Sequence, residues 1–591
     1  MTARPTSARE LDFTPVFEVT PSPRDWRDQF IYHLLIDRFD DANPDTPPFD
    51  SDRAAASEAG RDDGCRFQGG KIKGVTRRLD YLQGLGVTTL WISPPFKNRQ
   101  DCDFSCHGYG IQDFLAVDPR FGTMEDLREL VRAAHARGMY VVLDIIINHT
   151  GDNWGYKDDQ KLPYNETGPY DFGFWRRSNC ERTASSPSPG TPREGRGEGS
   201  SLGADDAVWP VELQDPDAYK RRGHIRDMGG ASLEEAINGD FESLKDLDLT
   251  RPQVLDTLIR VYKWWIAQTD CDGYRIDTVK HTEPEPTAIF CNAIHEYAKS
   301  IGKDNFFLFG ELVAGDELIQ KYVGSNTPTD PDTRYPLLDA VLDFPLYFVL
   351  EEVIKGLAAP GALIERYEKF RHFYRDYSQA GQYFVTFLDN HDQMHRPYRR
   401  FMANERDPNL AVIGAGYLLT SLGIPCLYYG TEQCFDGGGT SDVAVRENMF
   451  GGRFGAFRTS GMHFFRPDHP AYQGIARVAQ VRAAERPLRY GRQYFRDISG
   501  NGSDFGPPNA GKCTLAYARV LDTTSIVVAM NLDAQERNDH VAVDANLNPP
   551  GTVLTDLLSG RAYEVKTSPT GIACVHVPLK AREMVILKPN A

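Results

Sequence analysis

Eight short apolar segments constrain the fold of this chain more than any other feature. They are rich in β-branched and aromatic residues, and helical periodicity appears between them, as in Met124–Arg137 and Pro252–Gln268. The segments are Ile31–Ile36, Thr88–Ile92, Met139–Ile145, Gly273–Ile276, Phe306–Phe309, Ala340–Leu342, Tyr383–Phe387 and Cys426–Tyr428. Apolar strands that alternate with helices are typical of parallel sheets buried on both faces. Eight such units predict an α/β fold, a closed (β/α)8 TIM barrel.

Two regions depart from this alternation. A barrel allots roughly 31 residues to each strand–helix unit, and the interval from Ile145 to Gly273 is far longer. We therefore expect a lobe inserted after the third strand. Near the C-terminus, the β-type runs Thr524–Asn531, Val541–Asp544 and Met584–Lys588 are separated by Pro, Gly and Asn, which predicts an all-β sandwich domain.

The predicted organisation has four parts. They are 1–149, the first part of the barrel with an N-terminal arm; 150–248, the inserted lobe; 249–490, the second part of the barrel; and 491–591, the C-terminal β-sandwich. Within the lobe, residues 183–204 are dominated by Gly, Ser and Pro. Such a composition buries too little apolar surface to offset its ordering entropy, so a flexible loop is expected.

Charge and composition exclude some partners. The chain has 83 acidic and 66 basic residues, a formal net charge of −17, which disfavours nucleic acid and anionic membranes. No apolar run reaches the roughly 18 residues of a membrane helix. The N-terminal segment lacks the apolar core of a signal peptide, and the ten cysteines are irregularly spaced. A cytoplasmic location is predicted, and the oligomeric state is left open.

Three acidic residues directly follow predicted barrel strands. Asp277, Glu311 and Asp392 come after the fourth, fifth and seventh segments, so they should meet at the rim that carries barrel active sites. A lone acid there is more often a helix cap, but three together are costly unless their charges have a use. Paired carboxylates at such a rim fit glycoside hydrolysis.

The neighbours of two of these acids suggest different protonation states. Arg275 lies two residues before Asp277 and should share its face of the strand, where its charge would keep that carboxylate ionised. Glu311 follows an apolar run, which should raise its pKa, as a proton donor requires. Asp277 is thus the candidate nucleophile and Glu311 the candidate acid.

The segments that carry these residues resemble the signature regions of the α-amylase family of glycoside hydrolases, family 13. Further resemblances cover roughly residues 25–590 in the family's order, and point to members of the amylase, cyclomaltodextrinase and cyclodextrin glucanotransferase types. They lie at Asp144–His149, Gly86–Pro94, His107–Tyr109, Val117–Gly122 and Gly423–Glu432. The resemblance implies a catalytic barrel, a lobe after strand three and a C-terminal β-sandwich, the layout already predicted.

The resemblance also implies roles for individual residues. Asp277 corresponds to the nucleophile, Glu311 to the general acid/base and Asp392 to a residue that stabilises the transition state. The residues that correspond to substrate-binding positions are Tyr109, His149, Arg275, Lys280, His281 and His391.

A structural calcium ion is implied at the junction of barrel and lobe. Its ligands would come from the side chains of Asn148 and Asp246 and the backbone around His281. Ligation by oxygen atoms suits calcium. This cofactor is implied by the resemblance alone.

A second calcium site near Asp41, Asn43 and Asp45 is not expected. Lys71 stands where many relatives carry an aspartate, and an ammonium group opposes a divalent ion. An ion pair between Lys71 and one of these acids is expected in its place.

The predicted function is a retaining glycoside hydrolase that cleaves α-1,4-glucosidic bonds of starch-type α-glucans or maltooligosaccharides through a covalent glycosyl-aspartate. A transglycosylase of the same family remains an alternative because it uses the same intermediate. A non-catalytic family member is a distant alternative, since all three acids are present. The pair Lys280–His281 favours α-1,4 linkages, although Lys280 could instead form a salt bridge with a lobe carboxylate.

Overall fold

The computed structural model describes residues 4–50, 55–56, 64–99, 105–178, 181–182, 202–227, 229–323, 338–373, 377, 379–393 and 398–590. Of the expected flexible loop 183–204, all but 202–204 lies outside the described residues. In the described part of the chain, no helix combines the length and the apolar character needed to cross a membrane.

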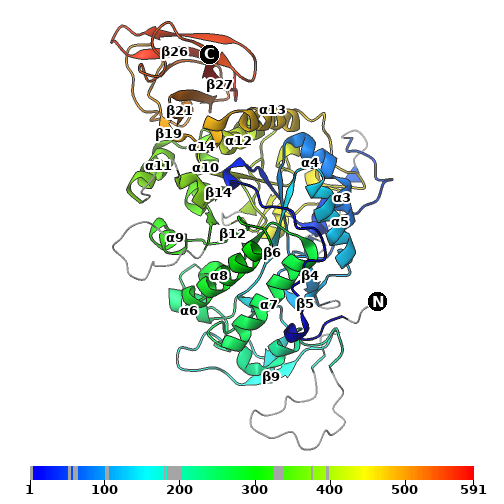
Figure 1. Cartoon of the computed structure of the whole chain (residues 1–591). Helices are drawn as coiled ribbons and strands as arrows, with labels where there is room; N and C mark the ends of the chain where they lie inside the picture. Colours follow the sequence, from blue (N-terminus) through cyan, green and yellow to red (C-terminus); the bar gives the residue numbers. More distant parts are fainter. Residues whose placement is uncertain are drawn as a thin grey trace, which may run out of the picture.

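A closed barrel of eight parallel strands forms the centre of the molecule (Figure 1). All eight predicted strands are confirmed, and they are neighbours in chain order, with the last strand pairing with the first. The strands are β1 (Ile31–Leu34), β3 (Thr89–Ile92), β6 (Tyr140–Ile145), β11 (Gly273–Ile276), β12 (Phe307–Gly310), β13 (Ala340–Leu342), β14 (Phe384–Thr386) and β16 (Ile424–Tyr428).

Alternate residues of these strands belong to two different cores. Trp91, Val142 and Phe309 pack inside the barrel, whereas Leu90 and Val141 pack outward against the helices. This period of two follows from the pleat of a strand. The helices that surround the barrel are α3 (Ile72–Arg77), α4 (Leu79–Leu85), α5 (Met124–His135), α7 (Pro252–Thr269), α8 (Pro284–Ser300), α9 (Asp316–Tyr322), α10 (Phe344–Ile354), α11 (Gly361–Phe373), α12 (Pro408–Thr420), α13 (Pro470–Ala484) and α14 (Arg486–Tyr490).

Local sequence explains where some helices begin and end. Thr123 and Asp126 form a reciprocal capping box at the start of α5. Pro487 lies in the first turn of α14. A proline fits there because the first turn leaves its backbone N–H groups without helical partners.

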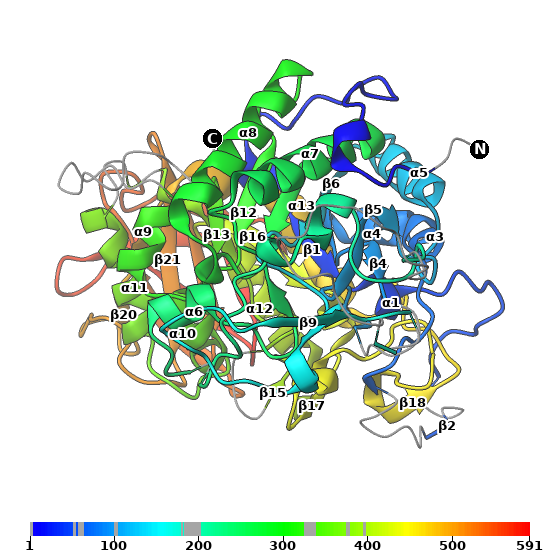
Figure 2. The same cartoon turned by 90° about the horizontal axis from the view of Figure 1, so that it is seen from below.

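The segment between β6 and α7 forms the inserted lobe. Figure 2 shows β9 and α6 of this segment in front of the barrel strands, at the end where the strands finish. Its elements are β7 (His149–Thr150), β8 (Trp154–Tyr156), β9 (Phe172–Trp175), α6 (Leu233–Asn238) and β10 (Lys245–Asp246). β7 and β10 pair in antiparallel fashion, which ties the end of the lobe to its beginning.

The C-terminal region is a nine-stranded antiparallel sheet at the opposite end of the molecule (Figure 1). It is hydrogen-bonded as one sheet, and its two halves share one core that includes Val527, Val541, Val575 and Val585. The predicted run at 541–544 is partly wrong, because its strand is Arg537–Ala542. The strands are β19 (Arg492–Phe495), β20 (Ile498–Ser499), β21 (Thr514–Leu521), β22 (Thr524–Asn531), β23 (Arg537–Ala542), β24 (Val553–Asp556), β25 (Ala562–Thr567), β26 (Ala573–Leu579) and β27 (Met584–Pro589).

Candidate active site

The three acids lie where the barrel strands end. Asp277 directly follows β11, Glu311 directly follows β12, and Asp392 lies in the loop after β14. Asp277 and Glu311 are buried, at 4% and 6% exposure, whereas the Asp392 side chain is 32% exposed. The first two side chains therefore line the floor of the site, and the third is open to solvent and to a ligand.

One guanidinium group holds three carboxylates at this floor. Nη1 of Arg275 donates to Oδ1 of Asp277 at 2.7 Å and to Oδ1 of Asp144 at 2.8 Å, and its Nη2 donates to Oε2 of Glu311 at 2.6 Å. Arg275 and Asp277 share a face of β11, as predicted. The arrangement orients Asp277 and Glu311 relative to each other through a single rigid fork.

The electrostatics of Asp277 differ from the expectation. Burial and the surrounding carboxylates raise the pKa of Asp277 well above its ordinary range, against the opposing effect of Arg275. The prediction that Arg275 suffices to keep Asp277 ionised is therefore wrong, because burial outweighs a guanidinium that also pairs with Asp144 and Glu311. The ionisation of Asp277 depends on the protonation of its neighbours.

The setting of Glu311 also differs from the expectation. The preceding residues of β12 are buried and apolar, as the sequence indicated, but the carboxylate itself accepts the hydrogen bond from Arg275. The apolar run before Glu311 is therefore confirmed, but the carboxylate also has a charged partner. Its other oxygen is not used by Arg275, which leaves it for a ligand.

Asp144 belongs to the site, although sequence analysis assigned it no role. Its Oδ2 accepts hydrogen bonds from Nε1 of Trp91 at 3.0 Å and from Oη of Tyr109 at 2.7 Å, and it is fully buried. The carboxylate therefore holds Arg275 and Tyr109 in place. Its sequence signal was a single acid within the apolar run of β6.

Tyr109 and His391 form an aromatic stack beside the acids. Their rings are nearly parallel, at 3°, with centroids 5.2 Å apart. Nδ1 of His391 lies 3.0 Å from Nε2 of His33, a buried residue of β1 that sequence analysis did not single out. Burial, together with His391 and Arg275, lowers the pKa of His33 well below its ordinary range, so this imidazole is neutral.

Two cationic or polar groups flank Asp392. Nη2 of Arg446 donates to its Oδ1 at 2.7 Å, and Nε2 of His391 lies 3.1 Å from its Oδ2. Burial opposes ionisation of Asp392, but His391 and Arg446 outweigh it and hold the pKa of this carboxyl below its ordinary range. Arg446 was missed because it lies far along the chain, in a loop without a periodic pattern.

His149, Lys280 and His281 lie at the border between barrel and lobe. Nε2 of His149 is 3.9 Å from Oδ2 of Asp277, and burial lowers the pKa of His149 to about 3, so it is neutral. Nδ1 of His281 contacts the carbonyl oxygen of Ala236 in α6 at 2.7 Å. Lys280 is half-buried and forms no ion pair with any described residue, so the alternative of a lobe salt bridge gains no support.

Two of the predicted calcium ligands, Asn148 and Asp246, come together, but with their present neighbours they do not fit a divalent ion. Nδ2 of Asn148 donates to Oδ1 of Asp246 at 3.0 Å, which confirms that these residues are neighbours. However, the ammonium group of Lys220 lies 3.7 Å from Oδ2 of Asp246 and 3.1 Å from Oε1 of Glu283. A calcium ion bound to the same oxygens would meet a like charge at contact distance.

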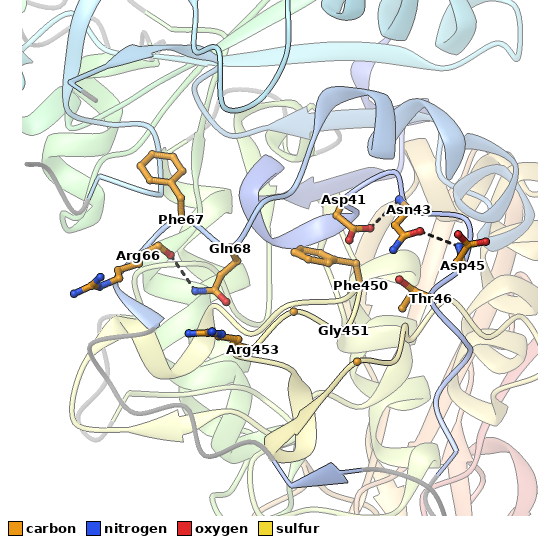
Figure 3. A pocket seen from close by; sticks show the side chains of 12 residues that line it. Asp41, Asn43, Asp45, Thr46, Arg66, Phe67, Gln68, Phe450, Gly451 and Arg453 are labelled. Atoms are coloured by element: carbon orange, nitrogen blue, oxygen red, sulfur yellow. Dashed lines mark hydrogen bonds between the residues drawn. The ribbon is translucent and has the colours of Figure 1, made fainter. Parts of the chain in front are cut away.

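Asp41, Asn43 and Asp45, where a second calcium site was not expected, line a pocket (Figure 3). Oδ1 of Asp41 accepts a hydrogen bond from the backbone N–H of Asn43, and Oδ1 of Asn43 accepts one from the backbone N–H of Asp45, each at 3.0 Å. The alternating Asp and Asn residues thus form successive turns. The expected ion pair of Lys71 is wrong: among the described residues its ammonium bonds to the carbonyl oxygen of Arg120, at 2.6 Å.

A closed (β/α)8 barrel with acids after β11, β12 and β14 has the active face of a barrel enzyme. The family model described as the catalytic domain of alpha amylase matches residues 33–201 and 232–452. The chain therefore belongs to the alpha-amylase family.

Individual relatives agree with this assignment. The chain is 31% identical to an alpha-amylase of Streptomyces lividans, over 88% of this chain and 56% of that protein. It is 27% identical to a cyclomaltodextrin glucanotransferase of Geobacillus stearothermophilus, over 90% of this chain and 63% of that protein. The structure of an alpha-amylase from Geobacillus thermoleovorans complexed with acarbose aligns with a TM-score of 0.66 and 26% identity, over 96% of this chain and all of that one. The chain thus spans less than two thirds of the length of these two curated relatives.

Proposed function

We propose that this chain is a retaining glycoside hydrolase that cleaves α-1,4-glucosidic bonds of α-glucans or maltooligosaccharides. One observation carries the proposal: Asp277 and Glu311 each place one oxygen on the same guanidinium, at 2.7 and 2.6 Å. This shared contact favours the close spacing of retaining enzymes over the wider spacing that an inverting enzyme needs for a water molecule.

In the first step, Glu311 donates its proton to the glycosidic oxygen while an oxygen of Asp277 forms a bond to the anomeric carbon. The bond between that carbon and the leaving sugar breaks, and the electron pair goes to the leaving oxygen. In the second step, Glu311 takes a proton from water, the water oxygen bonds to the anomeric carbon, and Asp277 leaves as a carboxylate.

The two acids are electrostatically coupled. The charge of Glu311 is one cause of the raised pKa of Asp277, so protonation of Glu311 favours ionisation of Asp277. The proposed mechanism requires that the single proton of this pair reside on Glu311 while Asp277 is charged. Asp392, kept ionised by His391 and Arg446, provides negative charge beside the developing oxocarbenium ion.

The substrate class rests on the border residues and the relatives. Lys280 has no ion pair with a described residue and lies just past Asp277, so its ammonium is available to the hydroxyl groups of a leaving glucose unit. The similarity to alpha-amylases and to cyclomaltodextrin glucanotransferases, by name, points to α-1,4-linked glucans. Isomaltose and sucrose should be poor substrates.

A transglycosylase is the second candidate, favoured by the similarity to a cyclomaltodextrin glucanotransferase over 90% of the chain. Both candidates share the first step and differ only in the acceptor. Product analysis on starch, maltotriose, cyclodextrin, pullulan, isomaltose and sucrose tests the proposal, with Glu311→Gln as the inactive control. Glucose and maltose from maltotriose support hydrolysis, longer or cyclic products support transfer, and faster cleavage of isomaltose than maltotriose contradicts the α-1,4 assignment.

A further inference from the structure

Backbone pairing fixes the position of Lys220 at the junction of barrel and lobe. Tyr219 forms an antiparallel bridge with Leu247, and the N–H of Lys220 donates to the carbonyl oxygen of Asp246 at 3.2 Å. The N–H of Leu247 in turn donates to the carbonyl oxygen of Asn148 at 2.8 Å. Three chain segments thus form a ribbon that places Lys220, Asp246 and Asn148 side by side.

The ammonium group of Lys220 is surrounded by oxygen atoms. It contacts the carbonyl oxygen of Ile237 in the last turn of α6, lies 3.1 Å from Oε1 of Glu283 and lies 3.7 Å from Oδ2 of Asp246. The Lys220 side chain is only 4% exposed and that of Asp246 is fully buried. A buried charge of this kind is stable only when opposite charge and hydrogen-bond acceptors surround it.

The same oxygen atoms are those that a hard cation would take. Asn148 turns its amide N–H toward Asp246, and its Oδ1 is buried without a hydrogen-bond partner among the described residues. The oxygen atoms of Asp246, Glu283, Ile237 and Asn148 line a cage at this junction, and they are of the types that a hard cation takes. The cage already holds one positive charge, which belongs to the chain itself.

We infer that the ammonium group of Lys220 is the resident cation of the barrel–lobe junction, and that this chain holds the junction together without calcium. Asp246 and Glu283 each place a carboxyl oxygen near the ammonium of Lys220. A divalent ion could take these oxygen atoms only if the ammonium moved away. Because the ammonium group belongs to Lys220, a residue of the lobe itself, a chelator cannot remove it.

This cation also links the lobe to the catalytic loop. Glu283 directly precedes α8 and lies in the segment that follows Asp277, so its contact with Lys220 ties that segment to the lobe. The carbonyl oxygen of Ala236, next to Ile237, binds His281 of the same segment at 2.7 Å. The last turn of α6 therefore receives one contact from the lobe lysine and one from the loop that carries Lys280.

Metal content and thermal unfolding of the full chain test the inference without reference to activity. The protein is dialysed against EGTA, then measured by elemental analysis and by melting with EGTA or with millimolar calcium chloride. The unmodified chain should carry no stoichiometric calcium and should melt at the same temperature in both buffers. Lys220→Ala should melt lower in EGTA and should gain roughly 5 °C with calcium, because the vacated oxygens bind the ion.

Lys245→Ala is the matched control. Lys245 is another buried lobe lysine, 3.4 Å from Asp152 and 4.0 Å from Asp240, but outside the cage. Lys245→Ala should melt at a lower temperature than the unmodified chain, and calcium should not raise that temperature. The inference is overturned if EGTA destabilises the unmodified chain, if that chain retains one calcium per molecule, if Lys220→Ala gains nothing from calcium, or if Lys245→Ala gains as much. Should Lys220→Ala fail to fold, the two measurements on the unmodified chain decide alone.

Discussion

A buried ion cluster at the far end of the barrel makes stability depend on pH. Nε2 of His135, at the end of α5, lies 2.8 Å from Oδ2 of Asp272, and its Nδ1 lies 3.3 Å from Oδ2 of Asp270. Nζ of Lys303 contacts both aspartates, at 2.8 and 2.9 Å. Asp272 directly precedes β11, so this cluster lies at the starting ends of the strands and away from the acids.

The magnitude follows from the pKa of His135. Burial opposes its protonation, but Asp270 and Asp272 outweigh burial and raise the pKa from 6.5 to about 9. The folded state therefore binds its proton more tightly than the unfolded state. The resulting stabilisation is about 3 kcal/mol, is fully present below pH 6.5 and is lost as the pH rises through 9.

The substitution His135→Gln removes this titration and keeps a hydrogen-bonding side chain. Urea unfolding at pH 6 and at pH 9.5 gives the free energy of unfolding of both proteins. The difference between them should shrink by about 3 kcal/mol between the two pH values, since other titrating groups cancel. His463→Gln serves as control, because burial lowers the pKa of His463 to about 4. Only the unfolded state takes up its proton at pH 6, so this substitution should change the difference in the opposite direction and by less than about 1 kcal/mol. A difference between unmodified chain and His135→Gln that stays constant with pH would refute the reasoning.

The other predictions concern the active site. Lys280→Ala should lower kcat/KM for maltooligosaccharides, by a factor that grows with the number of glucose units on the leaving side, and should leave kcat/KM for an aryl maltoside unchanged. An equal loss of kcat/KM for the oligosaccharides and for the aryl maltoside would exclude a leaving-group contact. Asp144→Asn should lower kcat on that aryl maltoside by roughly 100-fold or more, because Arg275 loses a fixed partner. The circular dichroism spectrum should stay the same, and an unchanged kcat would contradict the prediction. Arg446→Ala should lower kcat by roughly 10-fold or more through misplacement of Asp392, with partial recovery in Arg446→Lys; identical kinetics of the alanine variant and the unmodified chain would remove that positioning role.

The sequence allowed the barrel and its acids to be predicted for a physical reason. A parallel strand buried on both faces is a continuous apolar run, and an acid that ends such a run is conspicuous. Asp277 and Glu311 each follow a strand in this way, so their meeting at one rim required only the topology of a barrel. The strands of the C-terminal sheet were harder to predict, because buried and exposed residues alternate along them and their exposed ends carry no apolar signal.

The failures share a different cause. Lys220, Arg446 and His33 act through partners that the fold brings from distant parts of the chain, and no periodicity marks them. The charge of Arg275 could be assigned to Asp277 from spacing, but its division with Asp144 and Glu311 depends on three adjacent strands in register. The positions of side chains along one strand are predictable, whereas the sharing of one charge among several strands is a tertiary property.

Covalent trapping on Asp277 tests the central claim most directly. The chain is incubated with a 5-fluoro-α-glycosyl fluoride, digested and examined by mass spectrometry. The account predicts one glycosyl group attached to the peptide that contains Asp277, with none in Asp277→Asn. A glycosyl group on another residue would contradict it, and so would turnover of maltotriose with inversion at the anomeric carbon and no adduct.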